Sequence, residues 1–117
     1  MELSELVLKQ ISADRRRGFP VDFDSEVKRV QQIERDLIGL FGEIGEFANT
    51  LKKVSLALEH NRYDGPSLSE AGPNLKEELA DALIYMMRLS FLLGGNLEKD
   101  VIAKMKVNDG RYRPLEG

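Results

Sequence analysis

Residues 33–53 read IERDLIGLFGEIGEFANTLKK, and this stretch decides the fold. Its apolar side chains recur at alternating steps of three and four residues, a spacing that places them on one face of an α-helix. The apolar stripe consists of Val30, Ile33, Leu37, Leu40 and Ile44. Asp24 or Ser25 can cap this helix, so the sequence predicts one long helix over residues 26–58.

The rest of the chain also has the periodicity of helices rather than strands. Further helices are predicted at residues 2–16, 74–93 and 97–108. Residues 59–73 are rich in turn formers and predict a loop, Asn96 can cap the last helix, and residues 111–117 are expected to be irregular. We therefore expect an all-α protein, a single four-helix bundle-like domain over residues 1–117. Three methionines are expected in its core: Met86, Met87 and Met105.

Composition excludes several classes of protein. The chain has 117 residues, the length of one ordinary domain, and a net charge of −3, which argues against binding to the nucleic-acid backbone. It has no cysteine and one histidine, His60, so neither a disulfide framework nor a multi-histidine metal site is available. The longest apolar stretch, residues 79–93, is interrupted by Asp81 and Arg88 and falls short of a membrane span. With no signal-peptide pattern at the N-terminus, we expect a cytoplasmic protein that contacts neither membrane nor nucleic acid.

Glu43 and Glu46 form an acidic pair on the long helix. They are three residues apart and therefore neighbours on the helix surface. An isolated pair of this kind is usually a solvated face, but here the acids are interleaved with apolar residues. Gly39, Gly42 and Gly45 lie in the same turns, and each costs about 0.5–1 kcal/mol relative to alanine. The glycines suggest the close approach of a ligand or of another helix, and helix packing alone would explain them.

Glu78 and Asp81 repeat the acidic pair in the most apolar segment of the chain. A carboxylate buried there without a partner would cost several kcal/mol or become protonated, whereas a bound cation would compensate its charge. Tyr85 and Arg88 continue the same line at steps of four and three residues. They are expected to face the same cleft farther from the acids, where a sugar or base would lie. The alternative is that Tyr85 belongs to the core and Arg88 is its paired, partly buried cation.

The two acidic pairs can converge if their helices run antiparallel. A cluster of four carboxylates is unstable without divalent cations, and its oxygen ligands suit Mg²⁺, with Mn²⁺ as a substitute. Magnesium readily takes phosphate oxygens as further ligands, which points to a phosphorylated substrate. On the last helix, Lys104, Asn108 and Arg111 share one face and can contact phosphates, although such a row taken alone is usually solvated.

The chain resembles the MazG-like branch of the all-α nucleoside triphosphate pyrophosphohydrolases in three segments: GEIGEFANTLKK (42–53), EELADALIYMMRLS (77–90) and KMKVNDGRY (104–112). The resemblance covers roughly residues 27–112. Two features depart from the family pattern, namely the long spacer between Glu46 and Glu78 and the segment RRRGFPVDF (15–23). Both can shape the base pocket, so the resemblance leaves the base preference open.

The resemblance implies that a nucleoside triphosphate is hydrolysed to a nucleoside monophosphate and pyrophosphate, in the control of nucleotide pools. It implies that Glu43 or Glu46 orients or deprotonates the attacking water. The metal ligands that it implies are Glu43, Glu46, Glu78 and Asp81. The phosphate contacts that it implies are Lys53, Lys104, Asn108 and Arg111.

The long helix would project beyond a compact bundle unless something covers it, so we expect a homodimer or homotetramer. Two other functions remain open. One is a related helical enzyme that acts on phosphoribosyl-ATP. The other is a non-catalytic helical dimerisation module whose acidic residues are merely solvated.

Overall fold

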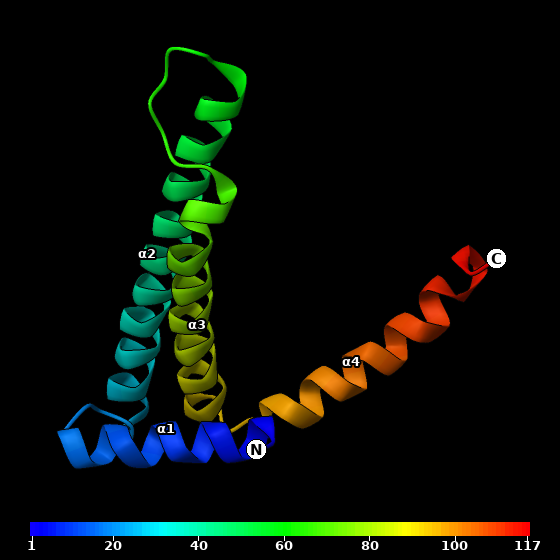
Figure 1. Cartoon of the computed structure of the whole chain (residues 1–117). Helices are drawn as coiled ribbons and strands as arrows, with labels where there is room; N and C mark the ends of the chain where they lie inside the picture. The colour runs from blue at the N-terminus through cyan, green and yellow to red at the C-terminus, as the bar shows by residue number, and fades with distance from the viewer.

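A computed structural model describes all residues, 1–117, and contains only helices (Figure 1). The all-α prediction is therefore confirmed. The elements are α1 (Leu3–Arg17), α2 (Glu26–Glu59), α3 (Leu68–Leu92), α4 (Leu97–Tyr112) and a short 3₁₀ helix, η1 (Arg113–Leu115). None of these helices combines the length and the apolar content that a membrane span would need.

The caps of three helices follow from local sequence. Gly18 ends α1 in the left-handed conformation, at φ 79°, where a side chain would be strained. Ser25 begins α2, and its hydroxyl accepts a hydrogen bond from the backbone N–H of Lys28. Asn96 caps α4 in the same way through the N–H of Lys99. Two of these caps, Ser25 and Asn96, are among those that the sequence predicted.

The predicted loop over residues 59–73 is too long. The connection between the helices ends at Ser67, and α3 begins at Leu68 with Pro73 inside it. Ser67 and Glu70 form a capping box, in which each side chain accepts a hydrogen bond from the other residue's backbone N–H. This start signal outweighs the proline, whose missing N–H deprives the helix of one hydrogen bond.

The predicted end of the chain also differs from the structure. The last helix runs to Tyr112 rather than to residue 108, and residues 113–115 form the 3₁₀ helix. Only the last two residues of the segment expected to be irregular lack helical structure.

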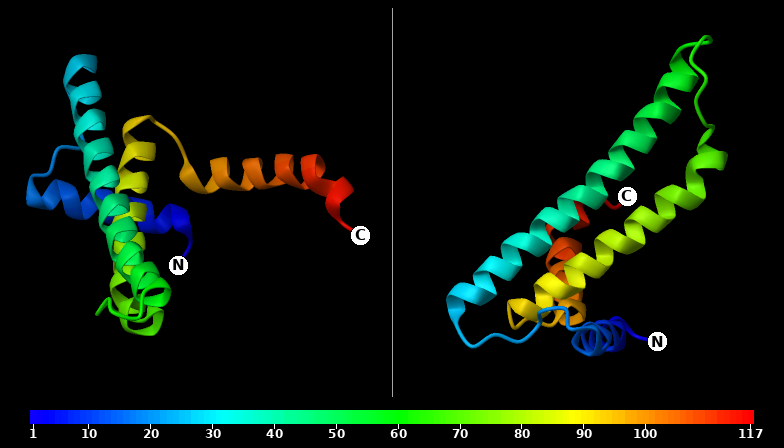
Figure 2. Two further views of the ribbon diagram at one scale, coloured as in Figure 1. Left: turned by 90° about the horizontal axis from the view of Figure 1, so that it is seen from above. Right: turned by 90° about the vertical axis from the view of Figure 1, so that its left-hand side faces the viewer.

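The long helices α2 and α3 lie side by side as an antiparallel hairpin, and α1 crosses the base of that hairpin (Figures 1 and 2). The hairpin has a small core of Val54, Ala71 and Leu75, with Phe47 packed against it. At the base, Ile11 of α1 is fully buried. These contacts fix the relative positions of the first three helices.

The fourth helix, α4, leaves the base of the hairpin and projects away from it (Figures 1 and 2). It has no buried residue. Of the three methionines expected in the core, Met87 is buried, but Met86 and Met105 are 40% and 60% exposed. That expectation was wrong for these two because helical periodicity identifies an apolar face and not what covers it.

Candidate metal site

Three carboxylates from two helices converge on one point. Glu43 and Glu46 come from α2 and Glu78 from α3, and one oxygen of each lies within 4.8 Å of those of the other two. The convergence follows from two pairs of acids at i, i+3 on helices that pack antiparallel. Asp81 is not a member of this close group, although the sequence placed it there.

Two oxygen atoms of this cluster lack partners. Glu43 Oε2 and Glu78 Oε2 are buried, and with all three carboxylates ionised neither accepts a hydrogen bond. Buried carboxylate oxygens are normally satisfied by donors or cations, because desolvation of an unpaired charge is costly. No arginine or lysine forms an ion pair with the cluster. The three carboxylates are therefore close enough together to hold a metal ion, and no cationic side chain neutralises them.

The proximity of the three acids changes their ionisation. The pKa of Glu78 rises from its ordinary value of 4.5 to about 8. Hydrogen bonding of its protonated form to Glu43, and next to Glu46, is the main cause. Burial and the negative charges of the same two residues act in the same direction. In the metal-free protein, protonation of Glu78 thus removes one negative charge from the cluster, and a bound cation would also reduce that charge.

A cavity of about 440 Å³ adjoins the cluster. Glu43 and Asp81 line it near the acids, and Tyr85 and Arg88 line it farther along α3. The loop between α1 and α2 contributes Phe19 to the same wall. Of the row that the sequence predicted to share a cleft, Asp81, Tyr85 and Arg88 line this cavity, and Glu78 does not. The cavity volume lies within the range of about 300–1,000 Å³ that small-molecule sites occupy.

Tyr85 occupies the position that a side chain at Gly39 would take. A Cβ built on Gly39 would overlap the phenol ring of Tyr85. One of the three glycines on α2 thus permits a close approach, as the sequence suggested. Gly42 and Gly45 face open space in the single chain.

Arg88 is buried, and three groups accept hydrogen bonds from its guanidinium. The Nε atom donates to Asp36 at 3.0 Å, Nη1 donates to Asp14 at 2.8 Å, and Nη2 donates to the carbonyl of Pro20 at 2.8 Å. Both aspartates are themselves buried. Arg88 is therefore the paired cation of the alternative interpretation, and it also forms part of the cavity wall. It ties α1, α2 and the loop between them to α3.

Sequence reasoning missed the two aspartates that hold Arg88. A signal was present, because the pattern Gln-x-x-x-Asp occurs twice, at residues 10–14 and 32–36. In the structure, Gln10 donates to Asp14 at 2.9 Å and Gln32 donates to Asp36 at 3.0 Å. Each pair spans one helical turn, and both glutamines line the cavity.

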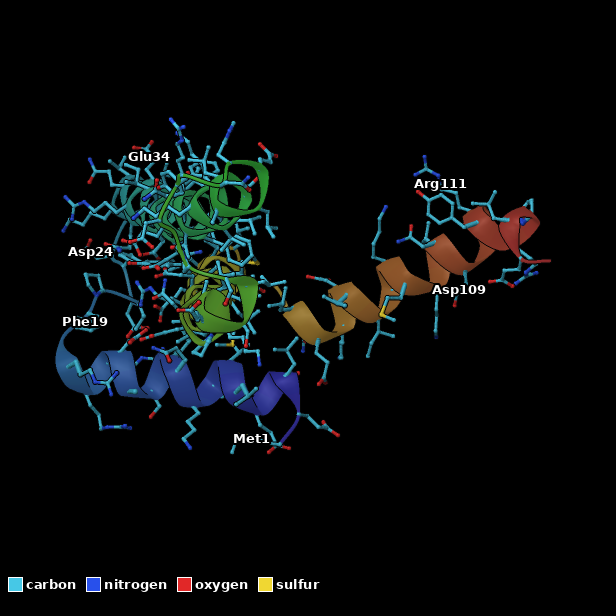
Figure 3. The ribbon with its side chains drawn as sticks, turned by 45° about the horizontal axis from the view of Figure 1, so that its top comes forward. Met1, Phe19, Asp24, Glu34, Asp109 and Arg111 are labelled. Carbon is cyan, nitrogen blue, oxygen red and sulfur yellow. The ribbon has the colours of Figure 1, made fainter.

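The predicted phosphate-binding residues lie elsewhere in this chain. Lys53 is exposed on α2, two turns beyond Glu46. The row Lys104, Asn108 and Arg111 belongs to the projecting helix α4. Figure 3 shows Phe19 and Asp24 on one side of the α2–α3 hairpin and Arg111 on the other. One chain by itself does not bring the row on α4 to its acidic cluster.

The donor set fits a hard cation. All three converging groups are carboxylates, and Asp81 offers a fourth within the adjoining cavity. Oxygen ligands of this kind suit Mg²⁺, which keeps waters or takes phosphate oxygens at its remaining positions. The unpartnered oxygens of Glu43 and Glu78 would offer a cation two ligands from two different helices.

The chain matches no family model and no solved structure. Over 76 residues it is 37% identical to dCTP pyrophosphatase 1 of Rattus norvegicus. The matched stretch is 65% of this chain and 43% of the relative. The chain thus spans less than half the length of the curated relative that it matches.

Proposed function

We propose that the protein is a magnesium-dependent nucleoside triphosphate pyrophosphohydrolase. Water attacks the α-phosphorus, the bond from that phosphorus to the oxygen bridging to the β-phosphate breaks, and a nucleoside monophosphate and pyrophosphate leave. The observation that carries this proposal is the convergence of Glu43, Glu46 and Glu78, with two buried oxygens that lack partners, beside a cavity large enough for a nucleoside. The partial likeness to a dCTP pyrophosphatase supports the same reaction.

The carboxylates of Glu43, Glu46 and Glu78 would hold the metal, with Asp81 reaching it from the cavity side. Bound Mg²⁺ would polarise phosphoryl oxygens and lower the pKa of a water molecule. Mn²⁺ can substitute because it prefers the same oxygen ligands. Two helices supply the ligands, so the α2–α3 hairpin has to be formed before the metal can bind.

Glu46 is the best placed of the cluster to accept the proton of the attacking water. It is exposed, whereas Glu43 and Glu78 are half-buried. A proton acceptor must lie within hydrogen-bond reach of the water from which it takes the proton. Glu43 has a buried oxygen that lacks a partner, so we assign it to holding the cation.

The cavity would bind the nucleoside. Tyr85 and Phe19 offer aromatic faces on which a base can stack, and the phenol hydroxyl of Tyr85 offers a hydrogen bond to the sugar or base. Asp81 and Glu43 lie at the end of the cavity where the phosphates would have to be. Deoxycytidine triphosphate is the first substrate to assay, because the relative is named for it.

Hydrolysis of a panel of nucleoside triphosphates tests the proposal. We expect pyrophosphate rather than phosphate as the product, strict dependence on Mg²⁺ or Mn²⁺, and loss of turnover with a chelator. Phosphoribosyl-ATP belongs in the same panel, because its preferential hydrolysis would indicate the related enzyme instead. Calorimetry with Mg²⁺ and a non-hydrolysable nucleotide covers the non-catalytic alternative. No binding heat and no turnover with any nucleotide would refute the proposal.

A further inference from the structure

Five polar residues form one continuous hydrogen-bonded network along the wall of the cavity. Arg88 lies at its centre and donates to Asp14 on one side and to Asp36 on the other. Gln10 extends the network beyond Asp14, and Gln32 extends it beyond Asp36. All five residues line the cavity of about 440 Å³ that adjoins the acidic cluster. We call them the polar network, and the helices α1, α2 and α3 all contribute to it.

Each aspartate of the polar network divides its two oxygens between two donors. Asp14 accepts from Arg88 with Oδ2 at 2.8 Å and from Gln10 with Oδ1 at 2.9 Å. Asp36 accepts from Arg88 with Oδ2 at 3.0 Å and from Gln32 with Oδ1 at 3.0 Å. Both aspartates are buried, so breaking any of these bonds would leave a buried oxygen without a donor.

These bonds fix the orientation of the two glutamine amides. A carboxylate can only accept hydrogen bonds, and a guanidinium can only donate them. Each amide therefore has to turn its nitrogen toward the aspartate, which leaves its oxygen on the other side. Within the chain, the amides of Gln10 and Gln32 make only the bonds that their nitrogens donate. Both glutamines are half-buried in the cavity wall, so their two amide oxygens are available to a ligand there.

The polar network also carries a net negative charge. Two carboxylates, those of Asp14 and Asp36, share the single guanidinium of Arg88, so one negative charge is in excess. The other two acids of the wall, Glu43 and Asp81, lie where the proposed metal and phosphates would be. The part of the cavity beside the polar network therefore favours the hydrogens of an amino group and disfavours a carbonyl oxygen.

We propose that Gln10 and Gln32 select the base of the nucleotide, and that Arg88 is a positioning residue that acts on them through the two aspartates. The selected bases are cytosine and adenine, which carry an amino group where uracil and hypoxanthine carry a carbonyl oxygen. An amino base and its carbonyl counterpart have nearly the same size, so the cavity volume cannot distinguish them, whereas a fixed amide oxygen can. The presence of a nucleotide in the cavity rests on the proposed function.

The selection depends on amides that cannot rotate. A glutamine free to turn by 180° offers either its oxygen or its nitrogen and accommodates both kinds of base. Here, rotation of the Gln32 amide would bring its oxygen against Asp36 Oδ1 and replace a hydrogen bond by repulsion between two acceptors. A carbonyl oxygen of the base that faces this amide thus stays unmatched. A mismatch of this kind corresponds to about tenfold or more in affinity.

Two matched pairs of nucleotides test the preference in the wild type. The pairs are the triphosphates of cytidine and uridine and those of adenosine and inosine, with the deoxy forms in the same panel. We expect kcat/KM to be at least about tenfold higher for the amino member of each pair. Calorimetry with Mg²⁺ and non-hydrolysable analogues of the same nucleotides should give the same order of affinity without turnover.

The two measurements separate the preference from the proposed function. If pyrophosphate is released from both members of each pair with equal efficiency, the selection by the glutamines is overturned and the proposed function stands. If the analogues bind in the expected order but no nucleotide is hydrolysed, the proposed function fails and the selection stands.

Asp36→Asn should reverse the orientation of one amide. Because Arg88 can only donate, the introduced amide has to give its oxygen to Arg88 and its nitrogen to Gln32. Gln32 then has to accept with its oxygen, which turns its own nitrogen away from residue 36. We expect the ratio of kcat/KM between the amino and carbonyl members of each pair to fall about tenfold. Asp22→Asn is the matched control, because Asp22 pairs with Arg15 at the surface outside the cavity, and it should leave the ratio unchanged.

Gln10→Met combined with Gln32→Met removes both amide oxygens and keeps side chains of similar length. The ratio within each pair should approach one. Gln31→Met is the matched control, because Gln31 is exposed on α2 and does not line the cavity. Circular dichroism and thermal melting show which variants are folded, and the double variant decides the question if Asp36→Asn does not fold. A role in stability alone does not change a ratio between nucleotides of the same size. A folded double variant that keeps the wild-type ratio would therefore overturn the proposal, as would a folded Asp36→Asn that keeps it.

Discussion

The phenol ring of Tyr85 lies against the backbone of α2 at Gly39, in the space that a Cβ would fill. Tyr85 is on α3 and is the one tyrosine of the cavity wall. Its contact with Gly39 places it about one turn of α2 from Glu43 of the acidic cluster. This contact explains why α2 tolerates a glycine near its centre. The identity of residue 39 thus controls the shape of the cavity without contacting the acids.

Gly39→Ala should therefore alter substrate binding more than folding. The new methyl group displaces the Tyr85 ring, so we expect KM for the nucleotide to rise about tenfold or the preference among nucleotides to change. Gly42→Ala is the matched control, because a Cβ there meets no atom in the chain and alanine favours the helix by about 0.5–1 kcal/mol. Steady-state kinetics and thermal melting of both variants check this. Equal kinetics for the two would show that the Tyr85 position is irrelevant to substrate.

Removing single charges from the acidic site should abolish turnover while preserving the fold. Glu43→Gln, Glu46→Gln, Glu78→Gln and Asp81→Asn should each lower kcat by about two orders of magnitude or more, as the loss of a key electrostatic group does. Above about pH 8, where Glu78 is ionised, the first three should also raise the melting temperature of the metal-free protein, because they relieve repulsion within the cluster. Glu77→Gln is the control, since Glu77 is exposed and outside the cluster.

One outcome would contradict this prediction. If the variants melt well below the wild type without metal and remain active, the acids are structural. Asp81 lies outside the close group of three carboxylates. Asp81→Asn should therefore weaken metal binding less than Glu78→Gln does.

The stability of the metal-free protein should fall as the pH rises. The pKa of Glu78 is about 8 in the folded chain, above its ordinary value of 4.5. The folded state therefore binds the proton more tightly than the unfolded state, and this stabilisation is complete below about pH 4.5 and lost as the pH rises through about 8. Added Mg²⁺ should restore the melting temperature at pH 8 and have little effect near pH 5, where protons compete for the site. Melting curves with chelator and with Mg²⁺ measure both effects.

Glu78→Gln is the control for this pH dependence. The variant cannot titrate at that position, so its metal-free melting temperature should vary less between pH 5 and pH 8. An identical pH profile for wild type and variant would assign the dependence to other groups.

Local patterns were sufficient to predict the helices and the acidic pairs. The steps of three and four residues around Leu40 predicted α2 to within one residue at its C-terminal end. Pairs at i, i+3 placed Glu43, Glu46 and Glu78 on facing surfaces, because antiparallel packing of the two longest helices brings such pairs together. The start of α3 was misplaced because the turn formers of residues 59–73 predicted a single loop, whereas the capping box at Ser67 determines where the helix begins.

Local sequence patterns could not predict which residues pair across different helices. Arg88 was expected either to face a sugar or base or to be a partly buried, paired cation, but its partners could not be named, and they are Asp14 and Asp36, 74 and 52 residues away. Nothing in the spacing of these residues indicates that α1 crosses the base of the hairpin. The direction of α4 was equally unpredictable, since its periodicity shows an apolar stripe but not where that stripe packs.

Arg88→Ala should destabilise the fold rather than act only on substrate binding. The change leaves two buried carboxylates without their cation, and breaking a buried ion pair costs about 3–5 kcal/mol. Arg15→Ala is the matched control, because the Arg15–Asp22 pair is exposed at both ends and should affect the melting temperature far less. Combining Arg88→Met with Asp14→Asn and Asp36→Asn removes all three charges together and should recover most of the lost stability. Chemical denaturation of the four proteins measures these differences. If Arg88→Ala melts like Arg15→Ala and changes only KM, the guanidinium serves the substrate and the two aspartates are satisfied without it.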